Sequence, residues 1–423
     1  MLTLQLFRQH RDLILEGLKK KHFKETEIVD EIIAIDERRR HMQVQNDQVA
    51  TFINSSSKSI GALKAQGKDA EAEAMKAEVS AKKEDAKNFA HQLAALEEEQ
   101  QHLLLRLPNL PHSSVPEGRT PEENEVVRSG GSVPELGEHK HPHWELTSKY
   151  KLIDFELGNK ITGSGFPVYT GQGARLQRAL IAYFLDHNTG AGYQEVYPPF
   201  MVNEASAYGT GQLPDKEGQM YHATEDNLYL IPTAEVPVTN LLRDTITQEQ
   251  DLPVKMTAYT PCFRREAGSY GKDVRGLNRL HQFDKVEIVQ FTHPDKSYDT
   301  LEEMALHVEK LLQHLELPYR VLRLCGGDMG FASALTYDFE VYSAAQERWL
   351  EVSSVSNFET FQTNRCKARF KNTEGKTQLL HSLNGSSLAL PRILASLLEN
   401  GQTADGIVLP EVLRPYFGST IIR

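Results

Sequence analysis

The chain of 423 residues is long enough for two domains, or for one large domain with an appendage. Its hydrophobic content of 39% and charged content of 25% are typical of water-soluble globular proteins. No apolar run is long enough to predict a membrane-spanning helix, so we expect no association with a membrane. The formal net charge of −11 argues against general nucleic-acid binding, so any RNA contact would depend on local basic patches.

The N-terminal residues and the cysteines indicate where the protein resides. Gln5, Arg8 and Arg11 interrupt the first apolar stretch, which is therefore too polar for a signal peptide. Three scattered cysteines without a CxxC pair fit a reducing compartment and argue against structural zinc. We therefore expect a cytoplasmic protein that needs no zinc.

A long proline-free tract near the N-terminus carries two ladders of residues spaced alternately four and three apart. The first ladder runs over residues 28–63 and the second over residues 72–103, with a glycine-containing break at residues 65–68. Such sustained seven-residue repeats predict two coiled-coil helices that fold back as an antiparallel hairpin. A hairpin of this kind is usually a dimerisation or spacer element, and the alternative is a rigid arm that reaches a large ligand. Residues 1–105 are thus predicted to form a helical N-terminal domain.

Residues 106–137 contain five prolines and four glycines, a density that predicts a linker between domains. His139, His141 and His143 follow at alternate positions and could in principle bind a metal. No carboxylate or cysteine is spaced to complete such a site, so we expect a polar loop that enters the next domain. Residues 138–423 mix predicted helices and strands and should form an α+β domain.

The region richest in candidate chemistry is residues 258–291, where two apolar runs flank a basic, glycine-rich middle that includes Lys272. This pattern predicts a β-hairpin with a long loop. Strand alternation then brings a cation, a ring and carboxylates to one side, as a polyphosphate, a nucleobase and an ammonium group would require. A solvent-facing hairpin would carry similar charges, so the hairpin alone does not decide the function. The residues expected to share this side are Arg264, Glu266, Phe283, Lys285 and Glu287.

Three further stretches contain residues suited to ligand binding. Residues 233–235 follow a predicted strand, and Thr233 would also serve as the N-cap of a helix. Residues 351–354 combine a carboxylate with hydroxyl groups in an alternating strand, which would also fit a half-buried strand with solvated side chains. Residues 384–392 place Arg392 at the start of a helix, where backbone amides also favour anions.

These stretches resemble the class II aminoacyl-tRNA synthetases, and the wording FRREAG…RGL…HQFDKVE is close to motif 2 of the seryl-tRNA synthetase subgroup. Residues 233–235 resemble the TAE signature of the serine pocket, residues 351–354 the strand that holds ATP and magnesium, and residues 384–392 motif 3. The helix from Gly171 and the strand predicted at residues 193–202 resemble motif 1, the dimer-forming element. Residues 337–340 resemble a scaffold strand of the family.

The resemblance covers nearly the whole chain and implies its fold and activity. It implies an N-terminal antiparallel coiled-coil arm that binds tRNA, followed by a class II catalytic domain built on an antiparallel β-sheet flanked by helices. The implied enzyme is a homodimeric serine–tRNA ligase that uses L-serine and ATP with Mg²⁺, and that charges tRNA(Ser) and also tRNA(Sec). Ser387 and Pro391 stand where the family often has glycine, which puts the backbone path at Ser387 in doubt.

The resemblance also implies a role for each matching residue. Arg264 would be catalytic, because its planar guanidinium can hold the α-phosphate and the serine carboxylate together. Glu351 and Ser354 would hold the magnesium ion, since both supply oxygen ligands. The residues expected to bind serine are Thr233, Ala234, Glu235, Arg264, Glu287, Asn384 and Ser386. The residues expected to bind ATP are Arg264, Arg265, Glu266, Arg275, Phe283, Glu351, Val352, Ser353, Ser354 and Arg392.

Two other functions remain open at this stage. The same adenylation site could charge a carrier protein, although such a ligase would not need the long helical hairpin. A non-catalytic coiled-coil scaffold would be expected to have lost the charged residues of the site. All five charged residues that such a scaffold would be expected to lack are present: Arg264, Glu266, Glu287, Glu351 and Arg392.

Overall fold

The computed structural model describes residues 1–138, 140–215, 217–267 and 275–423. The chain divides into two compact units. A helical unit comprises Leu2–Lys19 and Phe23–Pro108, and an α/β unit comprises Met1, Lys20–His22 and Asn109–Arg423. Among the described residues, no helix is both long and apolar enough to cross a membrane.

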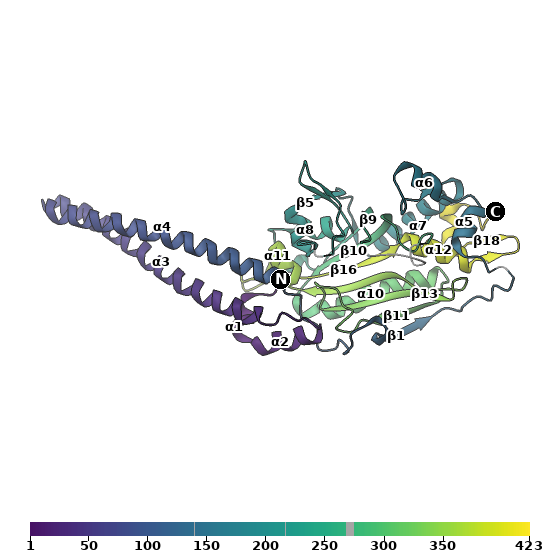
Figure 1. Ribbon diagram of the computed structural model, residues 1–423, viewed down its shortest axis with the longest axis horizontal. Coiled ribbons are helices and arrows are strands. Elements are labelled where there is room, and N and C mark those ends of the chain that lie inside the picture. Colours follow the sequence, from purple (N-terminus) through teal and green to yellow (C-terminus); the bar gives the residue numbers. More distant parts are fainter. Residues whose placement is uncertain (139, 216, 268–274) are drawn as a thin grey trace. The chain divides into compact units, whose positions relative to one another are not determined.

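The helical unit is dominated by the pair of long helices α3 and α4, which run antiparallel (Figure 1). Each has 38 residues, and the turn between them lies at the predicted break, where Gly67 has a φ of 73°. Their seam buries Ile32, Ile35, Val79 and Leu93, as the heptad ladders predict. The helices of the unit are α1 (Leu4–Gln9), α2 (Arg11–Lys20), α3 (Ile28–Ala65) and α4 (Asp69–Arg106).

Asp36 is buried near the base of this hairpin, and arginines surround it. Arg8 Nε lies 2.6 Å from its carboxylate, and Arg39 and Arg40 approach within 3.2 Å. The hydrogen bond from Arg8 is the main reason that the pKa of Asp36 is lowered. The pair therefore contributes stability at neutral pH that is lost as the pH falls below about 4 toward the lowered pKa.

We expect Asp36→Asn to destabilise the helical unit by about 1–2 kcal/mol, since charge-assisted hydrogen bonds to a buried carboxylate are lost. Asp30→Asn is the matched control, because Asp30 pairs with Arg11 but has a side chain that is 59% exposed. Urea unfolding followed by circular dichroism at pH 7 would measure both. Equal effects of the two variants would contradict a special role for Asp36.

The α/β unit is built on an eight-stranded sheet of order β1-β11-β12-β13-β16-β10-β9-β4, antiparallel except where β4 pairs with β9. Its strands are β1 (Glu125–Gly130), β4 (Gln194–Glu195), β9 (Val254–Phe263), β10 (Gln282–Thr292), β11 (Tyr319–Arg323), β12 (Leu335–Ser343), β13 (Arg348–Glu359) and β16 (His381–Ala389). The remaining strands form small sheets: β2 (Ile153–Asp154) and β3 (Val168–Tyr169); β5 (Met201–Asn203), β6 (His222–Ala223) and β7 (Leu228–Leu230); β8 (Ile246–Gln248), β14 (Arg369–Lys371) and β15 (Thr377–Leu379); and β17 (Gln402–Thr403), β18 (Gly406–Val408) and β19 (Ile421–Ile422).

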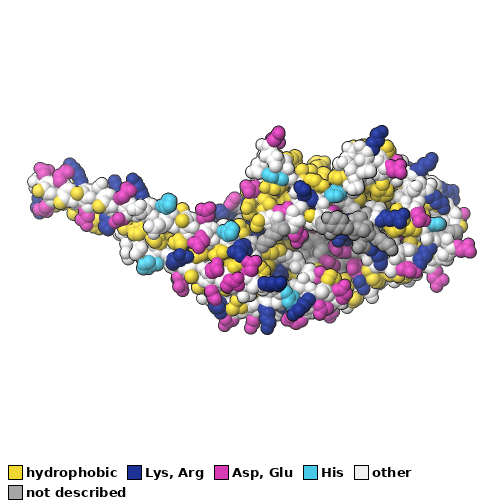
Figure 2. Space-filling model, in the orientation of Figure 1, with side chains coloured by type: hydrophobic (Ala, Val, Ile, Leu, Met, Phe, Trp, Pro, Cys, Tyr) yellow, Lys and Arg dark blue, Asp and Glu magenta, His cyan; other side chains and the backbone are white. Residues whose placement is uncertain are grey.

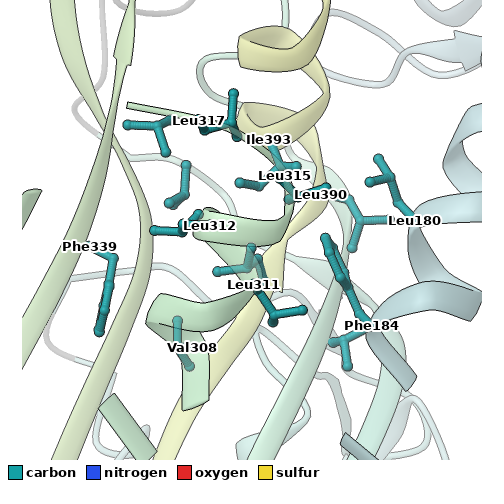
Figure 3. Close-up of a cluster of buried hydrophobic side chains, with 14 of the residues drawn as sticks. Leu180, Phe184, Val308, Leu311, Leu312, Leu315, Leu317, Phe339, Leu390 and Ile393 are labelled. Atoms are coloured by element: carbon teal, nitrogen blue, oxygen red, sulfur yellow. The ribbon is translucent and has the colours of Figure 1, made fainter. Parts of the chain in front are cut away.

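One face of the large sheet is buried against helices α7, α10 and α12. Figure 3 shows Phe184 of α7, Leu311 of α10, Ile393 of α12 and Phe339 of β12 in one apolar cluster. The period of two along each strand leaves the opposite face of the sheet for polar residues. The helices of this unit are α5 (His143–Lys149), α6 (Phe155–Ile161), α7 (Gly171–Gly190), α8 (Glu204–Thr210), α9 (Glu235–Thr239), α10 (Ser297–His314), α11 (Phe361–Cys366), α12 (Leu390–Asn400) and α13 (Arg414–Phe417).

Three expectations about local structure differ from the fold. The segment predicted as a linker contains β1, which pairs with β11 at the sheet edge, where proline-rich flanks are tolerated. The strand predicted at residues 193–202 is split into β4 and β5, because consecutive prolines between them cannot donate to a ladder. His143 is fully buried and is not part of a polar loop, whereas His139 lies outside the described residues.

Candidate active site

The polar face of β10 carries Lys285 and Glu287, which alternate with the core residues Val286 and Ile288. Lys285 Nζ lies 2.5 Å from Glu287 Oε2 and donates to Thr233 Oγ1 at 2.9 Å. The Thr233 hydroxyl in turn donates to Glu287 Oε2 at 3.3 Å. All three side chains are buried, so strand alternation and the segment before α9 together produce a buried, charged cluster.

A second carboxylate, Glu235, lies at the start of α9 beside this cluster. Its Oε1 accepts from Gln362 Nε2 at 2.6 Å. Burial is the main cause that raises the pKa of Glu235, and the charge of Glu287 adds to it. The Asn384 amide faces Glu235 closely enough to lower that pKa, yet within the described part of the chain its Nδ2 has no partner in hydrogen-bonding geometry. The cluster thus brings together two carboxylates, one ammonium and the amide of Asn384.

β16 pairs with β10 beside this cluster. Ser386 lies opposite Glu287 in the antiparallel ladder of β10 and β16 and is buried. Its carbonyl accepts from the Ser353 hydroxyl at 2.6 Å, so this hydroxyl connects β13 to β16 within the sheet. The Ser387 hydroxyl donates instead to Asn188 Oδ1 of α7 at 2.8 Å, on the core side.

Arg264 follows the last residue of β9 and lies at the edge of the buried cluster. Its guanidinium is 5.2 Å from the centroid of the Phe283 ring, within range for a cation–π interaction. Its Nε donates to the carbonyl of Pro232 at 3.3 Å, next to Thr233. The arrangement places a planar cation and an aromatic ring beside the buried carboxylates, as a phosphate and a nucleobase would require.

The two residues after Arg264 bond to different segments of the chain. The backbone amide of Arg265 donates to Gln219 O at 2.9 Å, and its guanidinium lies 5.7 Å from the Tyr221 ring centroid. Glu266 has a φ of 49° and accepts from Arg279 at 2.9 Å. The prediction that Arg264 and Glu266 share a strand face is therefore wrong, because β9 ends before them and the backbone changes direction.

A group of acidic residues lies on the polar face of β12 and β13. Glu340 faces Glu351 across the ladder, and Asp338 faces Ser354. Glu340 is paired with Arg320, but Asp338 Oδ1 is buried and has no hydrogen-bond partner among the described residues. Burial, and next the charge of Glu351, raise the pKa of Asp338 well above its usual range. The group therefore has an unbalanced carboxylate.

Arg392 lies in the first turn of α12 and reaches this acidic group. Its Nη1 donates to the backbone carbonyl of Glu351 at 2.7 Å and lies 3.8 Å from the Glu351 carboxylate. Its Nε donates to Asn278 O at 3.1 Å. Arg275 was predicted to bind ATP, and its guanidinium lies 4.7 Å from the Trp144 ring centroid. Lys272 lies outside the described residues.

Comparison with known proteins decides the family. Residues 1–111 match the model of the seryl-tRNA synthetase N-terminal domain, and residues 219–401 match the class II tRNA synthetase core domain of the G, H, P, S and T enzymes. A serine–tRNA ligase from Salinibacter ruber is 51% identical over 420 residues, which cover 99% of this chain and 98% of the relative. The chain belongs to the seryl-tRNA synthetase family.

Solved structures of the family agree over the full chain. The seryl-tRNA synthetase from Pyrococcus horikoshii, complexed with ATP, is 31% identical, with a TM-score of 0.91 over 100% of this chain and 99% of that one. The cytoplasmic serine–tRNA ligase from Naegleria fowleri, in complex with AMP, is 27% identical, with a TM-score of 0.88 over 100% and 99%. The predicted fold class, a helical arm followed by a class II domain, is confirmed.

The sequence patterns did not single out some residues of the candidate site. Lys285 was placed on the correct strand face but received no role, and Asp338 was assigned to scaffold. Alternation with the core residues Tyr337 and Phe339 would have placed Asp338 on the polar face. Gln362 lies far from the motifs, and no signal in the sequence points to it.

Proposed function

We propose that this protein is an ATP-dependent serine–tRNA ligase, which activates L-serine as seryl-adenylate and transfers the serine to the 3′-terminal ribose of tRNA(Ser). The observation that carries the proposal is the buried cluster of Glu287, Lys285 and Thr233 beside Arg264 and the Phe283 ring. Full-length similarity to serine–tRNA ligases supports it.

The buried cluster suits an amino acid with a small polar side chain. Glu235 and Glu287 face the ammonium of Lys285, so an incoming serine ammonium would balance the remaining negative charge. The free amide of Asn384 and the nearby Ser386 would meet the serine hydroxyl. Alanine would leave buried polar groups without partners, which is a strong basis for its rejection.

The first chemical step needs no general base, because the serine carboxylate is already ionised. One carboxylate oxygen attacks the α-phosphorus of ATP, a new P–O bond forms, the bond to the β-phosphate breaks, and pyrophosphate leaves. Catalysis is then positioning together with neutralisation of charge on the phosphate oxygens. Arg264 would hold the α-phosphate and the carboxylate, Phe283 would stack on the adenine, and Glu266 would accept from the adenine amino group.

We place a magnesium ion at the acidic group on β12 and β13, where protein side chains alone do not complete a site: no group of three or more His, Cys, Asp or Glu residues in the described part of the chain is arranged to hold a metal. Magnesium prefers oxygen ligands and is held by one or two carboxylates together with substrate phosphates. Glu351, with a side chain that is 52% exposed, and the Ser354 hydroxyl would hold the ion. The buried, unpartnered Asp338 Oδ1 indicates an unmet demand for positive charge or a donor in the described part of the site. When bound, the ion would neutralise charge on the ATP phosphates, while Arg392 would hold the γ-phosphate.

Asp338→Asn is expected to weaken magnesium binding, since residues behind metal ligands typically contribute about 10-fold or more to metal affinity. The magnesium concentration that supports half-maximal ATP binding, measured by calorimetry, should rise by about this factor. Glu340→Gln is the matched control on the same strand face, because Glu340 is paired with Arg320. An unchanged magnesium requirement in Asp338→Asn would remove Asp338 from the site.

The helical unit is proposed to bind tRNA(Ser), and also tRNA(Sec). On the visible face in Figure 2, Lys and Arg alternate with Asp and Glu along the hairpin, so RNA contact would come from selected cations and not from a continuous basic stripe. A homodimer is also proposed, because α7 and β4 fall where the resemblance puts motif 1. A cytoplasmic location is proposed as well. β4 ends the described sheet, so one of its edges is open to pairing.

The test is serine-dependent exchange of pyrophosphate into ATP without tRNA, with alanine, threonine and glycine as controls. Exchange with serine alone would support the adenylation site and its pocket. Exchange with a different amino acid would overturn the assignment of Thr233, Glu287 and Ser386, and no exchange with any amino acid would favour a scaffold. Deletion of residues 28–106 should then abolish transfer to tRNA while exchange persists.

A further inference from the structure

His143 is a fully buried residue at the first position of α5, outside the motifs that carry the proposed chemistry. Its ring connects two elements that are distant in sequence. Nδ1 lies 2.7 Å from Glu399 Oε1, and Nε2 accepts from the backbone amide of Leu277 at 2.9 Å. An amide N–H can only donate, so Nε2 carries no proton and Nδ1 must donate to Glu399. These two contacts therefore determine the orientation of the His143 ring.

Glu399 anchors the ring from α12, the helix that begins with Arg392. Its side chain is fully buried. Besides the ring, it accepts from the backbone amide of His143 at 2.8 Å, from Gln346 Nε2 at 2.9 Å and from the Ser343 hydroxyl. A buried carboxylate with this many donors is held rigidly and cannot easily be released.

The other side of the ring holds the end of the motif 2 loop. Gly276 has a φ of 67°, and a Cβ atom there would lie 2.2 Å from His143 Nε2, so the backbone approaches the ring as closely as glycine allows. Just before this glycine, the Arg275 guanidinium lies over the Trp144 ring. The residue after Leu277 is Asn278, which is 4% exposed.

Asn278 connects the backbone segment held by His143 to the proposed ATP site. Its side chain donates to Gln346 at 3.3 Å, and its backbone carbonyl accepts from Arg392 Nε at 3.1 Å. Arg392 Nη1 is held at the same time by the carbonyl of Glu351 at 2.7 Å. The direction of the Arg392 guanidinium therefore depends on where the Asn278 carbonyl lies.

We propose that His143 is a positioning residue for ATP: through Leu277 and Asn278 it holds the end of the motif 2 loop so that Arg392 points at the phosphates. His143 touches no substrate itself. The inference rests on the proposed role of Arg392 in serine activation. It assigns the histidine to neither metal binding nor proton transfer, because both of its ring nitrogens are already occupied.

Two substitutions separate the two bonds of the ring. Asparagine places its amide nitrogen near the position of Nδ1, so His143→Asn keeps a donor for Glu399 but cannot reach Leu277. Glutamine reaches the position of Nε2, so His143→Gln keeps an acceptor for Leu277 but loses the donor to Glu399. His141→Asn is the matched control, because His141 is exposed and pairs only with Glu145 among the contacts described for its side chain.

His143→Asn is expected to raise the KM for ATP about 5- to 10-fold and to leave the KM for serine nearly unchanged, with a moderately lower melting temperature because the buried Leu277 amide loses its acceptor. His143→Gln should also show a lower melting temperature, but with a nearly normal KM for ATP. In a Trp349→Phe background, acrylamide quenching of Trp144 should increase more in His143→Asn than in His143→Gln, because both variants remove the ring that packs edge-on against Trp144 but only His143→Asn also releases Leu277. Quenching should stay unchanged in His141→Asn. This second readout does not depend on activity.

The outcomes are decisive in each direction. A normal KM for ATP in His143→Asn, an equal rise in both KM values, or failure of this variant to fold would overturn the proposal, since His143 would then serve stability alone. Failure of the unmodified protein to exchange pyrophosphate would instead overturn the proposed function, while greater quenching of Trp144 in His143→Asn than in His143→Gln would still support the role of the bond between His143 and Leu277.

Discussion

Arg264→Ala is expected to lower the rate of serine-dependent pyrophosphate exchange by about a thousandfold, the loss typical when a positioned charge on a transferring phosphoryl group is removed. The guanidinium is already held beside the pocket by the carbonyl of Pro232 and the ring of Phe283. Little reorganisation is needed when ATP arrives. The effect should fall on the rate of the chemical step more than on the binding of serine.

The melting temperature of Arg264→Ala should stay within a few degrees of the unmodified protein, since the residue lies outside the apolar core. Arg264→Lys keeps the charge but not the planar fork, so it should recover only a small part of the rate. Arg323→Ala, at a pair with Glu125 on the sheet edge, is the control. Normal exchange in Arg264→Ala would contradict the catalytic assignment.

Glu287→Gln is expected to raise the KM for serine by a factor on the order of 100, because the serine ammonium loses its charged partner. The variant should also be less stable by about 3 kcal/mol, since the buried Lys285 would lose its directly paired carboxylate. Serine titration of the exchange rate and urea unfolding would measure the two effects separately.

The double variant Lys285→Met and Glu287→Gln separates stability from binding. Replacing a whole buried pair by less polar side chains is often nearly neutral, so the unfolding free energy should return toward the unmodified value. Serine binding should not return, because the double variant restores neither the Glu287 carboxylate nor the hydrogen bonds that it makes. Recovery of serine binding in the double variant would show that Glu287 acts only through the fold.

Local sequence patterns predicted the helical unit closely. The heptad ladders and the break at residues 65–68 correspond to α3 and α4, because helical periodicity depends on residues a few positions apart. The linker was predicted less well, since β1 is defined by its pairing with β11, about 200 residues later in the chain. Such pairing depends on long-range register, which proline and glycine counts do not contain.

Local sequence patterns likewise predicted some features of the candidate site and missed others. Strand alternation placed Lys285 and Glu287 on one face, and the family wording pointed to Thr233, Glu351 and Arg392. The end of β9 could not be predicted, because it depends on the bond from Arg265 to Gln219, outside the hairpin. The position of Asp338 beside Ser354 depended on the register between β12 and β13.

The sequence by itself determined the helical hairpin, the polar face of the motif 2 hairpin and the family, because these follow from short-range spacing and matching residue types. Only the tertiary structure decided which charges are balanced. Lys285 pairs with Glu287, and one oxygen of Asp338 has no hydrogen-bond partner among the described residues. His143 contacts Glu399, which lies 256 positions later in the chain. The energy of a buried charge depends on its neighbours in space, and those neighbours are chosen by the packing of the sheet against its helices.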